Sequence, residues 1–490
     1  MTVTMAAPIP STDAAKRKLG IRSVIGYGAG DFANNLAFSL STTFLLLYYT
    51  DVVGLPAAAI GTMFLVVRLW DAFADLFAGR MVDRTMTRLG KFRPFILFGS
   101  IPLLVMSVLT FAVPAGWDGG AQLMYAYLTY AVLGLIYSMV NVPYGSLATA
   151  MTQLSLERAK LAVARGIGAG LAGLLLTFII SPQIQNIAKN KALSADERAD
   201  ALQSVFLTTT LAFVAVGFVA YFLTFWWCKE VVVRIEPRVG IKDTFRTLKT
   251  NKPLGILCGS SFFYLIGAFA VGGSTAFYAI YVLGDATFII WITLATVIVQ
   301  FLTAPFVPFL VTKFGKKNLF QYCGLFTVVG GVGLFFVPGN LWWLAMLCIA
   351  VKGFGVSFIN TLMFALEADT VEYGEWKTGQ RTEGATYAIF SFTRKITQSI
   401  GGALGAFALA LGGYITKLAA DQVQPDSAIT AIKASIGLVP AAAAILAMIV
   451  FIAYPLTEKL YSDIVAENDT RKQKFLEQQN IATVPIPPVI

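Results

Sequence analysis

The chain has 490 residues, of which 57% are apolar and only 13% are charged, whereas a soluble domain carries about 25% charged residues. A fold surrounded by water could not bury this much apolar surface, so the composition excludes a soluble enzyme, a disordered chain and a disulfide scaffold. The net charge of +10 comes from lysines and arginines spread over short loops. This pattern is typical of membrane topology and argues against a nucleic-acid partner.

Two residue types limit the chemistry. There is no histidine, so any proton transfer has to use carboxylates, lysine, tyrosine or water. The four cysteines lie in or beside apolar runs without a paired spacing, so we expect no metal and no cofactor.

Apolar runs separated by Gly, Pro and charged residues predict twelve membrane-spanning helices. They are expected at 25–50, 57–80, 93–113, 121–148, 161–187, 205–229, 254–283, 286–312, 318–337, 341–367, 383–414 and 428–454. Basic and cation-poor loops alternate along the chain, which places both termini in the cytoplasm.

The basic segment 230–252 divides the spans into two sets of six. The predicted organisation is an N-tail at 1–20, a first half at 21–229, a central loop at 230–252, a second half at 253–455 and a C-tail at 456–490. The sequence Gly90-Lys91-Phe92 after span two has a fainter echo after span eight in Gly315-Lys316-Lys317. We therefore predict an all-α membrane protein with twelve transmembrane helices in two six-helix halves, the major facilitator fold, with its substrate site at mid-membrane between the halves.

Span one carries a polar stripe at helical spacing, Asp31, Asn35, Ser39 and Thr42. A carboxylate that accepts paired hydrogen bonds from neighbouring hydroxyls is a common way to hold a sugar ring. We expect Asp31 and Asn35 to bind substrate. The glycines at 26, 28 and 30 are equally well explained by close helix packing.

Span two places Arg68, Asp71 and Asp75 on one helical face. Charges at mid-membrane need a cavity or a partner, so this face is expected to look inward. Two carboxylates one turn apart repel each other, and binding a proton or a small cation relieves the repulsion. The alternatives are an ion pair with Arg68 that serves only structure, or a diphosphate–magnesium motif, which would need a second aspartate-rich helix that the spans lack.

Span four has an aromatic and polar face that includes Tyr137 and Asn141. Tyrosine rings pack on the apolar face of a pyranose, although such stripes serve helix packing as often. Arg165 lies a few residues inside span five, where it either binds substrate or extends to the membrane surface.

Span ten contains Lys352, and span eleven contains Arg394, Lys395 and Gln398, all deep within their spans. Basic residues thus outnumber acidic residues within the spans. An anionic ligand, most simply a carboxylated sugar, would balance this charge. These four residues and Arg165 are predicted to bind substrate.

Two charged segments at the predicted cytoplasmic face belong to opposite halves. Salt bridges between them would close that face when the halves rock, whereas ordinary solvated loops would explain the charges equally simply. The predicted gate residues are Asp83, Arg84, Lys91, Arg93, Asp369, Glu372, Glu375, Arg381 and Glu383.

Four motifs carry a family likeness: Asp71-Ala-Phe-Ala-Asp75, Gly90-Lys-Phe-Arg-Pro94, Asn141-Val-Pro-Tyr144 and Ala368-Asp-Thr-Val-Glu-Tyr-Gly-Glu375. From about residue 20 to 455 the chain resembles the glycoside–pentoside–hexuronide:cation symporters, the melibiose-permease group. Within this family, the stretches 72–79, 143–152 and 390–395 are most similar to members that carry glucuronides.

The resemblance implies a major facilitator fold and uphill sugar uptake coupled to a cation. By the family pattern, Asp71 and Asp75 match the cation site, Asp31 and Arg165 match the sugar-binding pair, and Lys395 matches the lysine of span eleven.

Asn141 stands where the sodium-using members have an aspartate. We assign Asn141 to the cation site and the sugar site together, and the departure favours protons over sodium. The expected protein is a monomer in a bacterial inner membrane, surrounded by lipid, that imports glucuronides with H⁺, Na⁺ being the other candidate. Three alternatives stay open: a carrier of neutral pentosides or galactosides, a lysolipid carrier, and a membrane enzyme.

Overall fold

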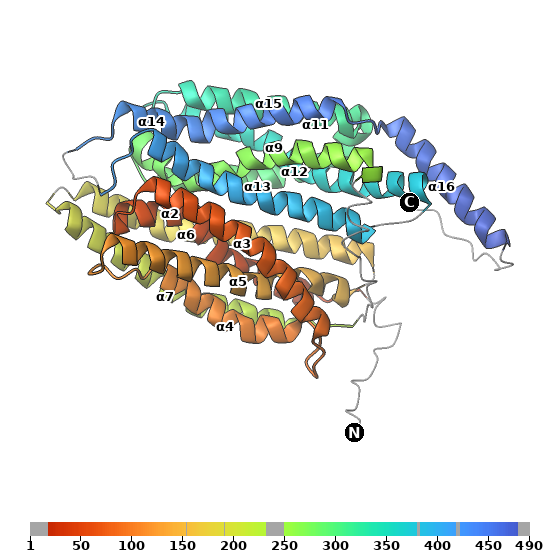
Figure 1. Cartoon of the computed structure of the whole chain (residues 1–490), viewed down its shortest axis with the longest axis horizontal. Coiled ribbons are helices and arrows are strands. Elements are labelled where there is room, and N and C mark those ends of the chain that lie inside the picture. Colours follow the sequence, from red (N-terminus) through yellow and green to blue (C-terminus); the bar gives the residue numbers. More distant parts are fainter. Residues whose placement is uncertain are drawn as a thin grey trace.

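The structure is a computed structural model that describes residues 18–152, 154–190, 192–231, 249–379, 383–417 and 422–478, and over these ranges it is almost entirely helical. The helices form two bundles that lie against each other along their length (Figure 1). The first bundle consists of α2 (Ile21–Leu47) with its π-helical extension η1 (Tyr48–Val53), α3 (Ala57–Arg84), α4 (Arg93–Thr110), α5 (Gly119–Met151), α6 (Ser155–Lys189) and α7 (Ala195–Trp227).

The second bundle repeats this arrangement and ends in an additional helix. It consists of α9 (Lys252–Phe277) with η2 (Tyr278–Val282), α10 (Phe288–Thr303), η3 (Ala304–Phe306), α11 (Val307–Phe336), α12 (Trp342–Thr378), α13 (Glu383–Leu411), and the series α14 (Asp426–Lys433), η4 (Ala434–Leu438) and α15 (Val439–Ile452). The last helix, α16 (Glu458–Gln478), projects from the bundle (Figure 1).

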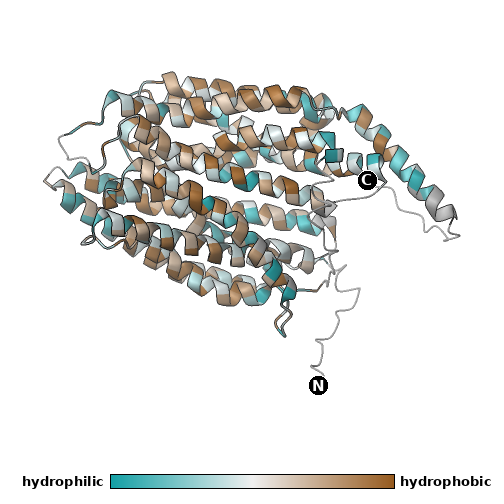
Figure 2. Ribbon diagram, viewed as in Figure 1, coloured by the Kyte–Doolittle hydropathy of each residue, from teal (hydrophilic) through white to brown (hydrophobic). Residues whose placement is uncertain are grey.

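Each of the twelve predicted spans coincides with one of these helices or helical series. In the described part of the chain, ten helices are long and apolar enough to cross a membrane, and α10 is a shorter apolar helix. The twelfth, α13, carries Arg394 and Lys395 near its middle. Hydrophobic residues predominate along the helices of the two bundles, whereas α16 is largely hydrophilic (Figure 2). The prediction of an all-helical membrane protein is confirmed.

The two bundles meet along three helix pairs, α3 with α13, α2 with α9 and α6 with α10. Each pair therefore joins one helix of the first half to one of the second. The start of α2 and helix α16 lie at the same end of the molecule (Figure 1), which we call the termini end, and the opposite end is called the far end. Most of the predicted N-tail and central loop, and the last part of the predicted C-tail, lie outside the described residues.

The repeat suspected at Gly90 and Gly315 has a structural basis. Both glycines have positive φ, 111° and 74°, a conformation that residues with a Cβ rarely adopt. Glu230, just after α7, accepts hydrogen bonds from the backbone N–H groups of residues 91, 92 and 93 at 2.8–2.9 Å. Glu458, at the start of α16, accepts one from Lys316 at 2.9 Å. In each half, therefore, a carboxylate that follows the sixth helix holds the backbone after the glycine.

The region after span eight differs from the prediction of a loop. Helix α11 already begins at Val307 and is only interrupted at Gly315. Lys317 Nζ donates to the carbonyls of Ile452 and Tyr454, at 2.9 and 2.7 Å. Of the basic residues of this region, Lys317 thus binds the C-terminal end of α15, whereas Lys316 pairs with Asp369 of α12.

Candidate functional site

The predicted sugar-binding residues of α2 and α6 lie together. Arg165 Nε donates to Asp31 Oδ1 at 3.1 Å. Asn35 Nδ2 donates to the Asp31 carbonyl at 2.9 Å and to Asp31 Oδ2 at 3.1 Å. Asp31 is only 6% exposed, while 41% of the Arg165 side chain is accessible. Arg165 thus pairs inside the bundle and does not extend to the membrane surface.

Close packing positions this pair. Gly28 lies against the backbone of Ala164, and a Cβ at Gly168 would overlap the backbone of α2. Tyr144 of α5 stacks on Tyr27 with ring centroids 4.7 Å apart and donates from its hydroxyl to the Tyr27 carbonyl at 2.5 Å. The glycines of span one therefore serve helix packing, and this packing brings α6 close enough for Arg165 to reach Asp31.

The charged face of α3 turns inward, as predicted. Arg68 NH1 lies 3.4 Å from Asp71 Oδ2, and its guanidinium lies over the rings of Phe38 and Tyr130 at 5.3 and 5.6 Å. The other oxygen, Asp71 Oδ1, is buried without a hydrogen-bonding partner. It faces Gly134, where an added Cβ would overlap it.

A cavity of about 30 Å³ lies at this carboxylate, lined in part by Arg68, Asp71 and Tyr137. Tyr137 stacks on Phe38 at 5.7 Å between ring centroids. The space admits a proton carrier or a small ion but no sugar.

The second aspartate of this face contacts the other half. Asp75 forms an ion pair with Lys395 of α13, and the charge of Lys395 also attracts Asp71. The structure thus places Lys395 with the predicted cation-site aspartates. Asn141 and Gln398 are half-buried on α5 and α13, and the described structure shows no hydrogen bond from either side chain.

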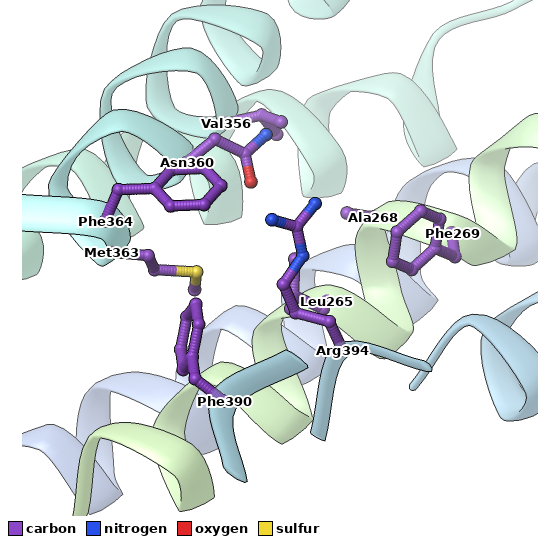
Figure 3. Close-up of a pocket in the computed structure, with 9 residues that line it drawn as sticks. All are labelled: Leu265, Ala268, Phe269, Val356, Asn360, Met363, Phe364, Phe390 and Arg394. Atoms are coloured by element: carbon purple, nitrogen blue, oxygen red, sulfur yellow. The ribbon is translucent and has the colours of Figure 1, made fainter. Parts of the chain in front are cut away.

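Arg394 points into a cavity of about 380 Å³ within the second half (Figure 3). Its guanidinium lies 5.0 Å from the centre of the Phe364 ring, and no hydrogen bond to it occurs in the described part of the chain. The charge of Glu367 on α12 attracts Arg394, and Arg165 of the first half is close enough to repel it more weakly. The cavity is lined by Leu265, Ala268, Phe269, Val356, Asn360, Met363, Phe364, Phe390 and Arg394.

Lys352 lies elsewhere. It is 6% exposed, and its Nζ donates to the carbonyl of Ile436 in η4 at 2.9 Å. The backbone of α11 packs against it at Gly330. The contacts given for Lys352 among the described residues lie in the second half, and its substrate role stays a prediction.

The predicted gate residues occupy the termini end. Arg93 donates to the Phe225 carbonyl at 2.8 Å, and Asp369 pairs with Lys316 at 2.6 Å, so these contacts stay within their own halves. The Glu372 carbonyl accepts from Asn468 of α16 at 3.1 Å. Arg84 is exposed, and Lys91 and Glu375 take part in further interactions. Arg381 and the side chains of Asp83 and Glu383 lie outside the described residues.

The sequence analysis missed a cluster at the far end. Asp51 accepts hydrogen bonds from the hydroxyls of Tyr281, at 2.8 Å, and Tyr414, at 2.7 and 2.9 Å. Asp51 belongs to the first half and both tyrosines to the second, so the cluster holds the halves together. The signal was the repeat of Tyr48–Gly54 in residues 278–284, which places Asp51 and Tyr281 at equivalent positions.

Comparison with known proteins shows the family of the chain. The family model described as MFS/sugar transport protein matches residues 26–458. The chain belongs to this family. It is 46% identical over 471 residues to the glucuronide carrier protein homolog of Escherichia coli K12, covering 96% of this chain and 99% of the relative. It is 32% identical to the isoprimeverose transporter of Lactiplantibacillus pentosus, covering 93% and 92%.

Among solved structures, a bacterial homolog of the human lysosomal transporter Spinster matches with a TM-score of 0.63 at 13% identity, covering 91% of this chain and 97% of that one. The fold is therefore that of the major facilitator superfamily. The protein is a multi-pass membrane transporter and not an enzyme.

Proposed function

We propose that this transporter imports glucuronides together with protons by alternating access. The observation that carries the proposal is that Arg165 and Arg394 of opposite halves lie close enough for their charges to repel, while Glu367 attracts Arg394 without a hydrogen bond to it in the described structure. A guanidinium held inside a membrane protein needs an anionic partner. The carboxylate of a hexuronic acid, bound between the two arginines, would supply it and draw the halves together.

The hydroxyl groups of the sugar would meet the first half. Asp31 Oδ2 and the Asn35 amide lie beside Arg165, so donors and acceptors for adjacent hydroxyls stand next to the cation. Tyr137 and Asn141 of α5 would complete this side, with Gln398 of α13 opposite. The relative named a glucuronide carrier homolog supports the same substrate class.

Asp71 and Asp75 would carry the coupling proton. Asp71 Oδ1 is buried without a donor, which favours a proton on that oxygen, while Lys395 neutralises Asp75. One proton that enters with one monoanion moves no net charge. Uptake is therefore expected to follow the pH gradient strongly and the membrane voltage weakly.

The test uses the purified protein in proteoliposomes. Labelled methyl β-glucuronide should accumulate when an inward pH gradient is imposed, and counterflow should be inhibited by glucuronides more strongly than by xylosides or galactosides. The Asp71→Asn variant should retain counterflow but lose accumulation. If uptake follows an imposed sodium gradient at constant pH and does not respond to the pH gradient, proton coupling is refuted.

A carrier of neutral glycosides is the second candidate, because the isoprimeverose transporter is 32% identical to this chain over 459 residues. Neutral sugars would not need Arg394. If Arg394→Gln transports a xyloside as well as the wild type does, and neither takes up a glucuronide, this second function holds.

For the location we propose a bacterial inner membrane, with the termini end facing the cytoplasm. The support is the excess of lysine and arginine in the loops at that end. A fluorescent reporter fused after residue 490 should be active only if the C-terminus is cytoplasmic. The bounds of the two halves, of the central loop and of the two tails, and the monomeric state, remain predictions from the sequence.

A further inference from the structure

The cavity at Arg394 is lined mostly by apolar side chains and by two polar ones. Helices α9, α12 and α13 surround it, and most of its lining is apolar, with three phenylalanines, a methionine and smaller aliphatic residues (Figure 3). Only Asn360 and Arg394 bring polar groups. Its volume of about 380 Å³ falls in the range of ligand pockets, and a mostly apolar lining with a few placed polar groups is typical of them.

This lining does not suit a sugar ring. A pyranose has hydroxyl groups around its whole edge, and each would lose hydrogen bonds among Phe269, Phe364 and Phe390. An aromatic or other planar apolar group fits better, because it buries its faces against these rings and can stack on the Arg394 guanidinium. Phe364 already occupies one face of that guanidinium, 5.0 Å from its ring centre.

The cavity also lies beside the proposed sugar site, because Arg394 belongs to both. Arg394 belongs to the cavity wall, and Arg165 of the first half lies close enough for the two charges to repel. In a β-glucuronide, the carboxylate at C5 and the glycosidic oxygen at C1 flank the same ring oxygen. The group attached to the sugar therefore leaves the ring on the edge that carries the carboxylate. If Arg394 binds that carboxylate, the attached group enters the cavity beside it.

We propose that this cavity is the aglycone subsite and selects planar apolar aglycones. The inference rests on the proposed function, since it takes the sugar to be a glucuronide. It assigns a different task to each half: the first half recognises the sugar hydroxyls, and the second half recognises what is attached to the sugar. Free glucuronate and methyl β-glucuronide leave the subsite empty.

The experiment compares phenyl β-glucuronide with methyl β-glucuronide as inhibitors of counterflow in proteoliposomes. Wild-type protein should bind the phenyl compound about tenfold or more tightly, because burying a phenyl ring removes roughly 100 Å² of apolar surface from water. Ala268→Phe fills the cavity, and Phe364→Leu removes the ring beside Arg394. Both variants should lower the ratio of phenyl to methyl affinity towards one.

The matched control is Ala442→Phe, the same substitution at an exposed position of α15, and it should keep the wild-type ratio. A wild-type ratio of one, or a ratio that Ala268→Phe and Phe364→Leu both leave unchanged, would overturn the subsite while glucuronide uptake stands. Failure of every glucuronide to inhibit would overturn the proposed function and the subsite with it. Inhibition by a lysolipid that Ala268→Phe abolishes, without a phenyl preference, would assign the cavity to an acyl chain and also refute the proposal.

Discussion

The hydrogen bond described between Arg165 and Asp31 uses the Nε of the arginine. The two terminal nitrogens of the guanidinium can therefore bind a substrate carboxylate while Nε keeps its bond to Asp31. Lysine has the same charge but a single ammonium group, which cannot serve both partners in this geometry. Arg165→Lys should therefore lose about 1.5–3 kcal/mol of binding, roughly 10- to 150-fold in affinity for methyl β-glucuronide. Inhibition of counterflow measures the loss. Arg22→Lys, at an exposed position, is the control, and an equal loss in both variants would contradict the role.

Gly134 gives the second prediction at this scale, because Asp71 Oδ1 occupies the space where a Cβ would stand. Gly134→Ala should displace the carboxylate and impair accumulation driven by a pH gradient, by about tenfold or more if Asp71 carries the proton. Gly255→Ala adds the same methyl group in open space on α9 and should accumulate substrate normally. Normal coupling in Gly134→Ala would show that the position of Asp71 is not critical.

Spacing along one helix was sufficient to predict the inward face of α3 and the polar stripe of α2, because residues three or four apart share a face. The same spacing could not predict which side chains meet between two helices. Spacing gave no indication that Lys395 pairs with Asp75 or that Lys352 binds the Ile436 carbonyl, and a substrate role for either lysine stays a prediction. Depth in the membrane could be counted from the sequence, whereas the direction of each side chain depends on how its helix packs.

At the scale of elements, hydropathy predicted all twelve spans because each must supply about 20 apolar residues. It could not predict α16 as a docked helix, since this helix is polar and held by specific bonds. Trp376 Nε1 donates to Glu467 Oε2 at 2.7 Å, and this bond, with those from Arg471, lowers the pKa of Glu467. Because the pKa is lowered in the docked helix, this contact stabilises docking at neutral pH and is lost as the pH falls through that pKa.

One glutamate follows the sixth helix of each half, and the two should differ in how much they stabilise the protein. Glu230 accepts three backbone hydrogen bonds and Glu458 accepts one, and hydrogen bonds to a charged group contribute about 1.5–3 kcal/mol each. Replacing the carboxylate with an amide weakens each bond and puts a donor beside other donors. Glu230→Gln should therefore lower the melting temperature of the detergent-solubilised protein more than Glu458→Gln. Equal effects would mean that Glu230 does not stabilise the loop through these bonds.

At the scale of the whole molecule, the repeat brings equivalent positions into contact. The segments Tyr48–Val53 and Tyr278–Val282 are both π-helical, and each is followed within two residues by a glycine with positive φ, 87° at Gly54 and 78° at Gly284. At their ends Asp51 binds Tyr281 across the two halves, and Tyr414 joins them. The backbone N–H of Ala286 in the second half also donates to Gln185 Oε1 of the first half at 2.7 Å. The far end is thus closed by contacts that must break for alternating access.

Asp51→Asn tests this closure. The neutral amide accepts more weakly from the two tyrosines, so a loss of about 1.5 kcal/mol should raise the population open at the far end roughly tenfold. The readout is the rate at which an impermeant thiol reagent labels Thr42→Cys, because the Thr42 backbone lies against Gly272 of the other half. Asp118→Asn is the control, since Asp118 caps α5 within the first half and asparagine caps helices equally well. Faster labelling with Asp51→Asn alone supports the closure, whereas unchanged labelling, or an equal increase in the control, would show that Asp51 does not hold the halves together.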